Sequence, residues 1–186
     1  MEINIDTIIH DDDPRIRQHS ADVPLPLSEE DESLLRAMHQ YVAESQDDEL
    51  AEEKNLQPAV GIAAIQLGIP KKMIAVVVPG EDEDSVIEYA LANPKILSRS
   101  RELNALKTGE GCLSVPETVE GYVFRPARVK VRAFDLLSNQ EVLIKAEGYL
   151  AIVLQHEIDH LTGKLYYDHI NTENPFEIPS NAAVLE

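Results

Sequence analysis

The chain has 186 residues, of which 16 are Lys or Arg and 34 are Asp or Glu, so its net charge is −18. Because so acidic a surface repels phosphate backbones and anionic lipid headgroups, we expect neither direct binding of nucleic acid nor attachment to a membrane. Hydrophobic residues make up 44% of the chain, which is enough for a buried core, and the length suits one domain covering residues 1–186.

The first predicted element is a helix. Pro24 and Pro26 precede Ser28, whose hydroxyl can cap a helix, and acidic residues fill the turn that follows. Apolar residues then recur at helical spacing. We predict a helix from about Leu27 to Ser45.

From Met73 onward the pattern changes to short runs rich in β-branched residues, which are typical of strands. Acidic segments or turn-forming Gly, Pro, Asn and Ser residues separate these runs, as expected for antiparallel strands joined by turns. The predicted strands are Met73–Val78, Val86–Leu91, Lys95–Ser98, Val129–Phe134 and Glu141–Ile144.

Helical periodicity returns from about Gly148 to Thr162, and Gly163 suits a helix C-terminus. Helix and strands do not alternate regularly, which favours an α+β fold with antiparallel strands rather than a parallel α/β sheet. The tail after Asn171, interrupted by Pro175 and Pro179, is expected to be loosely held.

The last predicted helix contains the sequence His-Glu-x-x-His. His156 and His160 are one helical turn apart on the same face, so their imidazoles can bind one ion. Glu157 stands next to the first of them. Its carboxylate can act on a water beside the ion without being a ligand, which is what metal-assisted hydrolysis requires.

The sequence leaves the third metal ligand open, although catalytic sites usually have three. A metzincin would have a histidine three residues after Gly163, but that residue is Tyr166. A thermolysin-like site needs a helical glutamate some twenty or more residues downstream, where only Glu177 and Glu186 remain. Cys112 is the remaining candidate, as a thiolate, and its alternative role is that of a buried structural cysteine.

Three apolar residues extend the face of the histidine motif toward the start of the helix. Tyr149, Ile152 and Val153 fall on the same helical stripe as His156 and His160. They belong to the core, or they also form the wall of a hydrophobic pocket beside the metal.

A segment of small apolar residues, 60–66, ends in Gln66. Small residues allow a backbone to pass close to a ligand, and the Gln66 amide offers two N–H donors. Such segments more commonly only pack in a core.

Three segments of the chain form a pattern together. They are Gly61-Ile62-Ala63-Ala64-Ile65-Gln66, Glu110-Gly111-Cys112-Leu113-Ser114 and Gln155-His156-Glu157-Ile158-Asp159-His160-Leu161. In this order they resemble peptide deformylase, and the resemblance covers nearly the whole chain. The acidic insert near Gln46–Glu53 and the strand-rich tail without a basic helix are similar to the longer form of Gram-positive bacteria. Ala59 stands where the first motif usually has glycine.

The resemblance implies an α+β fold with antiparallel strands packed around a central metal-binding helix. It also implies a hydrolase that removes the N-formyl group from the N-terminal methionine of newly made polypeptides and releases formate. It implies that Cys112, His156 and His160 hold the metal and that Glu157 is the general acid and base. Gln66 and the backbone N–H of Leu113 would form the oxyanion hole. The implied substrate-binding residues are Val60, Gly61, Gly111, Tyr149, Ile152 and Val153.

The implied cofactor is one divalent ion. The resemblance leads us to expect Fe(II), and one sulfur with two nitrogens would also suit Zn, Ni or Co. The expected partners are N-formylmethionyl nascent peptides, which would place the enzyme near the ribosome. Asp159 lies inside the third motif but points away from the face of His156 and His160, so we expect it to be a structural charge paired with Arg125 or Arg128.

The compartment is predicted from the lack of targeting signals. The longest apolar runs are six residues, whereas a membrane span needs roughly 20, and the first residues lack a secretory signal. Cys112 is the only cysteine, and a lone thiol is most easily kept in a reducing compartment. We therefore expect a cytoplasmic protein.

Two other classes of protein share part of this pattern. A general metalloprotease would use His156, Glu157 and His160 but would not need Cys112. A structural metal protein would need a fourth protein ligand, and the chain has no second cysteine to provide one.

Overall fold

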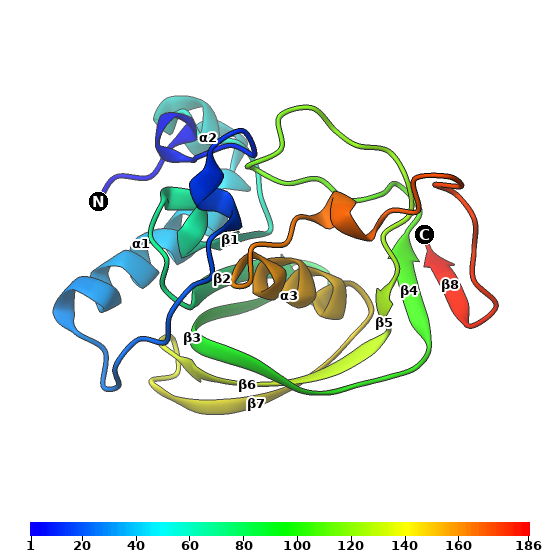
Figure 1. Ribbon diagram of the computed structural model, residues 1–186. Coiled ribbons are helices and arrows are strands. Elements are labelled where there is room, and N and C mark those ends of the chain that lie inside the picture. Colours follow the sequence, from blue (N-terminus) through cyan, green and yellow to red (C-terminus); the bar gives the residue numbers. More distant parts are fainter.

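The computed structural model describes all residues from Met1 to Glu186. Its main sheet has five antiparallel strands in the order β1-β2-β3-β6-β7 (Figure 1). The α+β class expected from the sequence is confirmed. The strands are β1 (Gly61–Ala63), β2 (Met73–Pro79), β3 (Val86–Arg99), β6 (Arg128–Asp135) and β7 (Gln140–Glu147).

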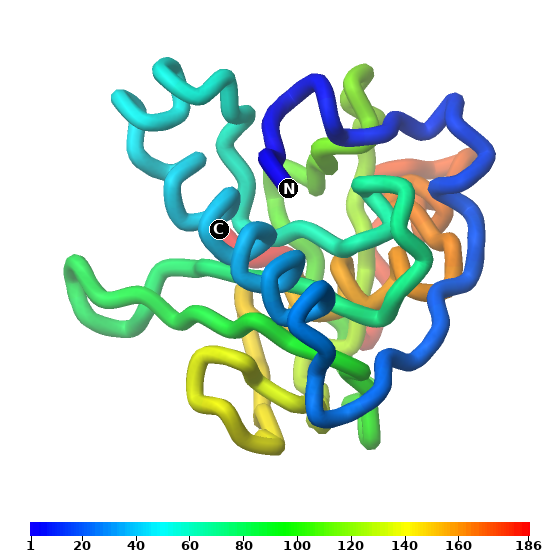
Figure 2. The backbone as a smooth tube through the Cα atoms, turned by 90° about the vertical axis from the view of Figure 1, so that its left-hand side faces the viewer, coloured from blue at the N-terminus to red at the C-terminus, as the bar shows by residue number.

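Two helices pack on opposite faces of this sheet. Successive residues of a strand point to opposite faces, and β2 follows this rule. Ile74 and Val76 belong to one hydrophobic cluster with residues of α3 (Gly148–His160). Ala75 and Val77 belong to a second cluster with residues of α1 (Glu29–Ser45). The tube view shows α1 in front of the sheet, with α3 on the other side (Figure 2).

A smaller sheet lies beside α3 and contains β5 (Arg125–Pro126), β4 (Leu103–Leu106) and β8 (Ala182–Leu185) in that order. β8 pairs in parallel with β4. The prediction of a loosely held tail is therefore wrong for this segment. Its partner lies far earlier in the chain, so no local pattern in the tail indicates the pairing.

The helix ends are largely as predicted. The Ser28 hydroxyl accepts a hydrogen bond from the Asp31 N–H at 3.1 Å and caps α1. α3 ends at His160, two residues before the predicted end. Gly163 follows with φ +74°, and a Cβ there would collide with the carbonyl of Arg17. Glycine is therefore required at this turn.

The two strands predicted between 86 and 98 are one strand, β3. The separator, Asn93-Pro94, is absorbed in a shift of register between Ala92 and Lys95. Asn93 adopts φ 53°. Its side-chain amide accepts a hydrogen bond from the Val23 N–H at 2.8 Å and donates one to the Val23 carbonyl at 2.9 Å. This pairing with a distant segment stabilises a conformation that would otherwise interrupt a strand.

The remaining elements are short. The acidic insert contains α2 (Asp48–Lys54), which the sequence did not predict because only Ala51 of it is buried. None of the helices combines the length and the apolar sequence that crossing a bilayer would require. The 3-10 helices are η1 (Ile5–Thr7), η2 (Pro14–Arg17), η3 (Ala64–Leu67) and η4 (Tyr166–His169).

Candidate active site

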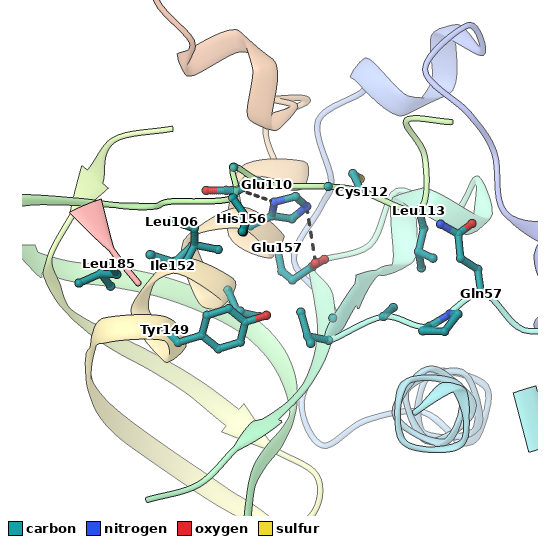
Figure 3. Close-up of a pocket in the computed structure, with 18 of the residues that line it drawn as sticks. Gln57, Leu106, Glu110, Cys112, Leu113, Tyr149, Ile152, His156, Glu157 and Leu185 are labelled. Carbon is teal, nitrogen blue, oxygen red and sulfur yellow. Dashed lines mark hydrogen bonds and ion pairs between the residues drawn. The ribbon is translucent and has the colours of Figure 1, made fainter. Parts of the chain in front are cut away.

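The two histidines of α3 converge with the single cysteine. The ligand atoms of Cys112, His156 and His160 all lie within 4.8 Å of one another. Cys112 Sγ is 3.5 Å from His160 Nε2. Helical spacing places the two imidazoles on one face of α3. The loop after β4 brings Cys112 to the same place, near His156 (Figure 3).

The donor set fits a transition-metal ion. His156 Nδ1 is 2.8 Å from a Glu110 carboxylate oxygen, which leaves Nε2 as the ring nitrogen available to an ion. One sulfur and two imidazole nitrogens suit Zn, Fe, Co or Ni. Three protein ligands also leave a coordination position open, as in catalytic rather than structural sites.

Glu157 lies beside this centre and is almost completely buried, with 3% of its surface exposed. Its Oε1 is 3.9 Å from His156 Nε2, and its Oε2 has no hydrogen-bond partner. Burial raises the pKa of Glu157 to about 7, against the opposing charges of His156 and Arg125. This carboxyl can therefore take up and release a proton near neutral pH.

The position of the Glu157 side chain explains why residue 61 is glycine. A Cβ at residue 61 would lie 2.8 Å from both Cγ and Oε1 of Glu157. Any side chain there would displace the carboxyl group. At Gly111, by contrast, a Cβ would meet no atom within 4 Å, so the backbone there borders open space.

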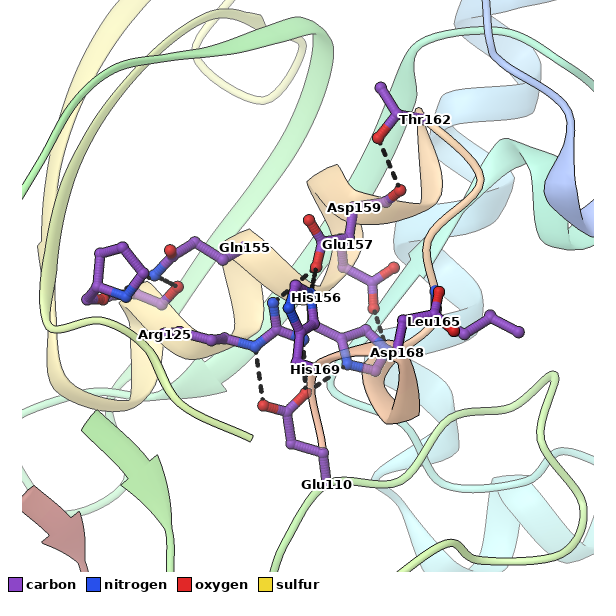
Figure 4. Close-up of polar contacts among 12 residues, drawn as sticks. Glu110, Arg125, Gln155, His156, Glu157, Asp159, Thr162, Leu165, Asp168 and His169 are labelled. Carbon is purple, nitrogen blue, oxygen red and sulfur yellow. Dashed lines mark hydrogen bonds and ion pairs between the residues drawn. The ribbon is translucent and has the colours of Figure 1, made fainter. Parts of the chain in front are cut away.

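A buried ion-pair network supports His156 from behind (Figure 4). The Arg125 guanidinium donates to Glu110 through Nε at 2.8 Å and Nη2 at 3.0 Å. It also donates through Nη1 to Asp159 at 2.8 Å. Of the two partners expected for Asp159, Arg125 is therefore correct, whereas Arg128 pairs with Glu102.

The sequence did not predict the role of Glu110. For Arg125 it predicted the pairing with Asp159 but not the pairing with Glu110. Burial would raise the pKa of Glu110, but hydrogen bonds from His156 and Arg125 outweigh it and lower that pKa. Glu110 therefore stays ionised and orients the His156 ring. A signal was available, since metal-binding histidines usually donate to a carboxylate or carbonyl, and Glu110 stands two residues before Cys112.

Gln66 is held in one orientation by η3. Its Oε1 accepts the Ala63 N–H at 2.9 Å, so its Nε2 points the other way. Nε2 donates to the Ser114 hydroxyl at 3.1 Å and lies 3.5 Å from Cys112 Sγ. The backbone N–H of Leu113 donates no hydrogen bond within the chain. Gln66 Nε2 therefore borders the centre formed by the cysteine and histidines, and the unbonded N–H of Leu113 belongs to the residue after Cys112.

A pocket of about 600 Å³ opens beside this centre. Of the predicted site residues, all but the fully buried His160 line it. The apolar stripe on α3 divides between pocket and core. Ile152 is 2% exposed and belongs to neither hydrophobic cluster, so its side chain faces the pocket. Val153 belongs to the hydrophobic cluster between α3 and the sheet and also lines the pocket, so it serves both the core and the pocket.

The outer wall of the pocket comes from the small sheet and was not predicted. Leu106 of β4 and Leu185 of β8 are register partners, and both line the pocket (Figure 3). Ala59 lines the inner side. Its φ is not positive, and its N–H donates to the Ser45 hydroxyl at 3.1 Å. Alanine in place of glycine is therefore unstrained there.

The fold and the site together define a metal-dependent hydrolase with a Cys-His-His centre, a buried glutamate and an apolar pocket. The family model described as polypeptide deformylase matches residues 5–176. The chain belongs to this family, whose members remove the N-formyl group from newly made polypeptides.

Relatives match over nearly their whole length. The chain is 48% identical over 179 residues to peptide deformylase 2 of Bacillus cereus, covering 96% of each chain. It is 45% identical to the peptide deformylase of Ligilactobacillus salivarius, covering 99% of this chain and 100% of the other. The crystal structure of peptide deformylase from Ehrlichia chaffeensis superimposes with a TM-score of 0.71 at 32% identity, covering 94% of this chain and 91% of that one. The expected resemblance to a Gram-positive form is confirmed.

Proposed function

We propose that this chain deformylates N-formylmethionyl polypeptides with one divalent ion held by Cys112, His156 and His160. The observation that carries this proposal is the juxtaposition, in one cavity, of the three-donor centre, the buried Glu157 and an apolar pocket. Fe(II) is the proposed metal, on the basis of the family, and Zn, Ni and Co fit the same donors.

The proposed chemistry divides among few groups. The metal would supply Lewis-acid activation of a water molecule. Glu157 takes the proton from that water and passes it to the leaving nitrogen, for which a pKa near neutrality is suited. Gln66 Nε2 and the Leu113 N–H donate to the oxygen of the formyl group as negative charge develops on it.

The pocket would receive the methionine side chain. Val60, Tyr149, Ile152 and Val153 supply apolar surface, and the backbone at Gly61 and Gly111 would bind the peptide as an added strand. We also propose that the whole chain is one catalytic domain, since its two hydrophobic clusters pack on the two faces of a single sheet. The nature of the substrate supports a cytoplasmic enzyme that works near the ribosome.

A comparison of blocked peptides tests the reaction. Formyl-Met-Ala-Ser should release formate, whereas acetyl-Met-Ala-Ser should be inert, because the formyl carbon carries only hydrogen and a tight site excludes a methyl group. An unblocked longer peptide should stay intact. Cleavage of its internal bonds would instead indicate a general metalloprotease.

Replacing Gln66 by leucine should slow turnover while binding of a formyl-Met peptide is nearly unchanged, because an oxyanion donor acts chiefly on the transition state. One such donor contributes roughly 3 kcal/mol, or about 10²-fold in kcat. Steady-state kinetics of the variant give both parameters. A change confined to KM would show that Gln66 serves ground-state binding.

Replacing Ile152 by aspartate should depress kcat/KM for formyl-Met peptides far more than it alters metal content, because it places an unpaired carboxylate in the pocket. Leu143→Asp is a matched control, since Leu143 is 53% exposed on another surface. With the unchanged enzyme, formyl-norleucine should match formyl-Met, and formyl-Ala should lose roughly 0.8 kcal/mol per unburied methylene. An equal loss of kcat/KM in the two variants would show that Ile152 does not contribute to the substrate pocket.

A further inference from the structure

Part of the main sheet has no helix on its outer face. Val129, Val131 and Ile144 face α3, so the residues between them on β6 and β7 point to the opposite side. α1 covers that side only over the first strands of the sheet and contacts β1, β2 and β3. We define the open sheet face as the outward residues of β6 and β7 and of the second half of β3. Its exposed members include five bases, two acids and one leucine: Lys95, Arg128, Lys130, Arg132, Lys145, Glu141, Glu147 and Leu143.

Two pairs on the open sheet face set like charges directly opposite each other. Lys130 is the register partner of Lys145, and Lys95 is the register partner of Arg132. Like charges at such positions destabilise a sheet. The three lysines form no ion pair, and only Arg132 has a partner among these four residues, Glu141 at 3.3 Å. The chain has 34 acidic residues but does not neutralise these lysines.

The spacing of the charges suits a linear polyanion. Alternate residues of a strand lie about 6.7 Å apart on one face, so Arg128, Lys130 and Arg132 form a regular row along β6. At the end of this row is a hollow of about 620 Å³. Four basic residues line it, together with the serines 98 and 100 and two acids, Glu81 and Glu147; the basic residues are Arg99, Arg128, Lys130 and Lys145.

We propose that the open sheet face binds the phosphate backbone of RNA. The expectation of no direct nucleic acid rested on the total charge of −18, which hides this local separation of charge. The acidic remainder of the surface would be repelled by phosphate and would orient the protein with this face toward the RNA. A lipid-binding face would need a broad apolar surface beside its bases, and the large hydrophobic residues exposed on these strand segments are only Leu97 and Leu143.

The position of this face relates it to the active site. Tyr149 lines both the hollow and the substrate pocket. The hollow is also lined by Val129 and Ala146, which face α3, so it lies where the open sheet face meets the α3 side of the sheet. RNA that extends from the open sheet face into the hollow would therefore reach the start of α3 beside Tyr149. The proposal does not depend on the catalytic roles, because none of its basic residues touches the metal centre.

Binding of a fluorescent RNA duplex of about 20 base pairs, titrated from about 50 to 200 mM salt, tests the proposal. The wild-type chain should bind at low salt and lose affinity as salt rises. Lys130→Gln with Lys145→Gln should weaken binding about tenfold or more and reduce the salt slope by roughly 2. Its melting temperature should not fall, because the double variant removes a like-charge pair.

The matched control is Lys54→Gln with Lys72→Gln, which changes net charge equally at lysines paired with Glu44 and Asp22. It should bind RNA as the wild type does. Deformylation of a short formyl-Met peptide should be unchanged in both double variants, so loss of RNA binding and loss of catalysis are distinguishable. The proposal is overturned if the wild type does not bind at low salt or if both double variants weaken binding equally. Tighter binding to anionic vesicles than to RNA would also overturn it.

Discussion

Replacing Glu157 by glutamine is expected to leave the metal bound and to slow deformylation by about 10²–10⁴-fold. The amide fits the same buried space but cannot take a proton from water or deliver one to the leaving nitrogen. Elemental analysis and kcat measured on the same preparation check both parts. Glu147→Gln is the control, since Glu147 is an exposed glutamate at the start of the same helix whose side chain makes no capping hydrogen bond.

Near-normal turnover of Glu157→Gln would remove this residue from the mechanism. The structure gives a reason to expect otherwise. Glu157 Oε2 is buried without a hydrogen-bond partner, which is costly for a group that serves only the fold. Glycine at residue 61 is also needed to make room for it.

Replacing Cys112 by alanine is expected to remove both bound metal and activity. Two imidazoles alone hold an ion weakly, and the thiolate supplies the negative charge of the donor set. Because an ion bound only by the folded chain stabilises it, a chelator should lower the melting temperature of the wild type but leave that of Cys112→Ala unchanged. Full metal occupancy in the variant would refute ligation by Cys112.

The elements that the sequence predicted well are those with local signals. The caps at Ser28 and Gly163, together with the helical periodicity of the apolar residues, place α1 and α3 within about two residues. The spacing of His156 and His160 is enough to put them on one face, because residues four apart are neighbours on any α-helix. Cys112 could be assigned only through the family resemblance. Nothing in its position in the sequence shows that the loop after β4 lies against α3 in the folded chain.

What the sequence did not predict depends on contacts between distant segments. Leu185 reaches the pocket only because β8 pairs with β4. The support of His156 by Glu110 and Arg125 joins three separate parts of the chain. The like-charge pairs of the open sheet face arise from the register of β6 against β3 and β7. Composition averages over such arrangements and cannot show them.

Formate release and metal content, measured on one sample as the metal is removed and restored, test the proposed function most directly. We predict that release of formate from a formyl-Met peptide rises in proportion to bound metal and reaches its maximum at one ion per chain. Full formate release from metal-free protein, or none from protein carrying one ion per chain as Fe(II), Zn, Ni or Co, would contradict the account.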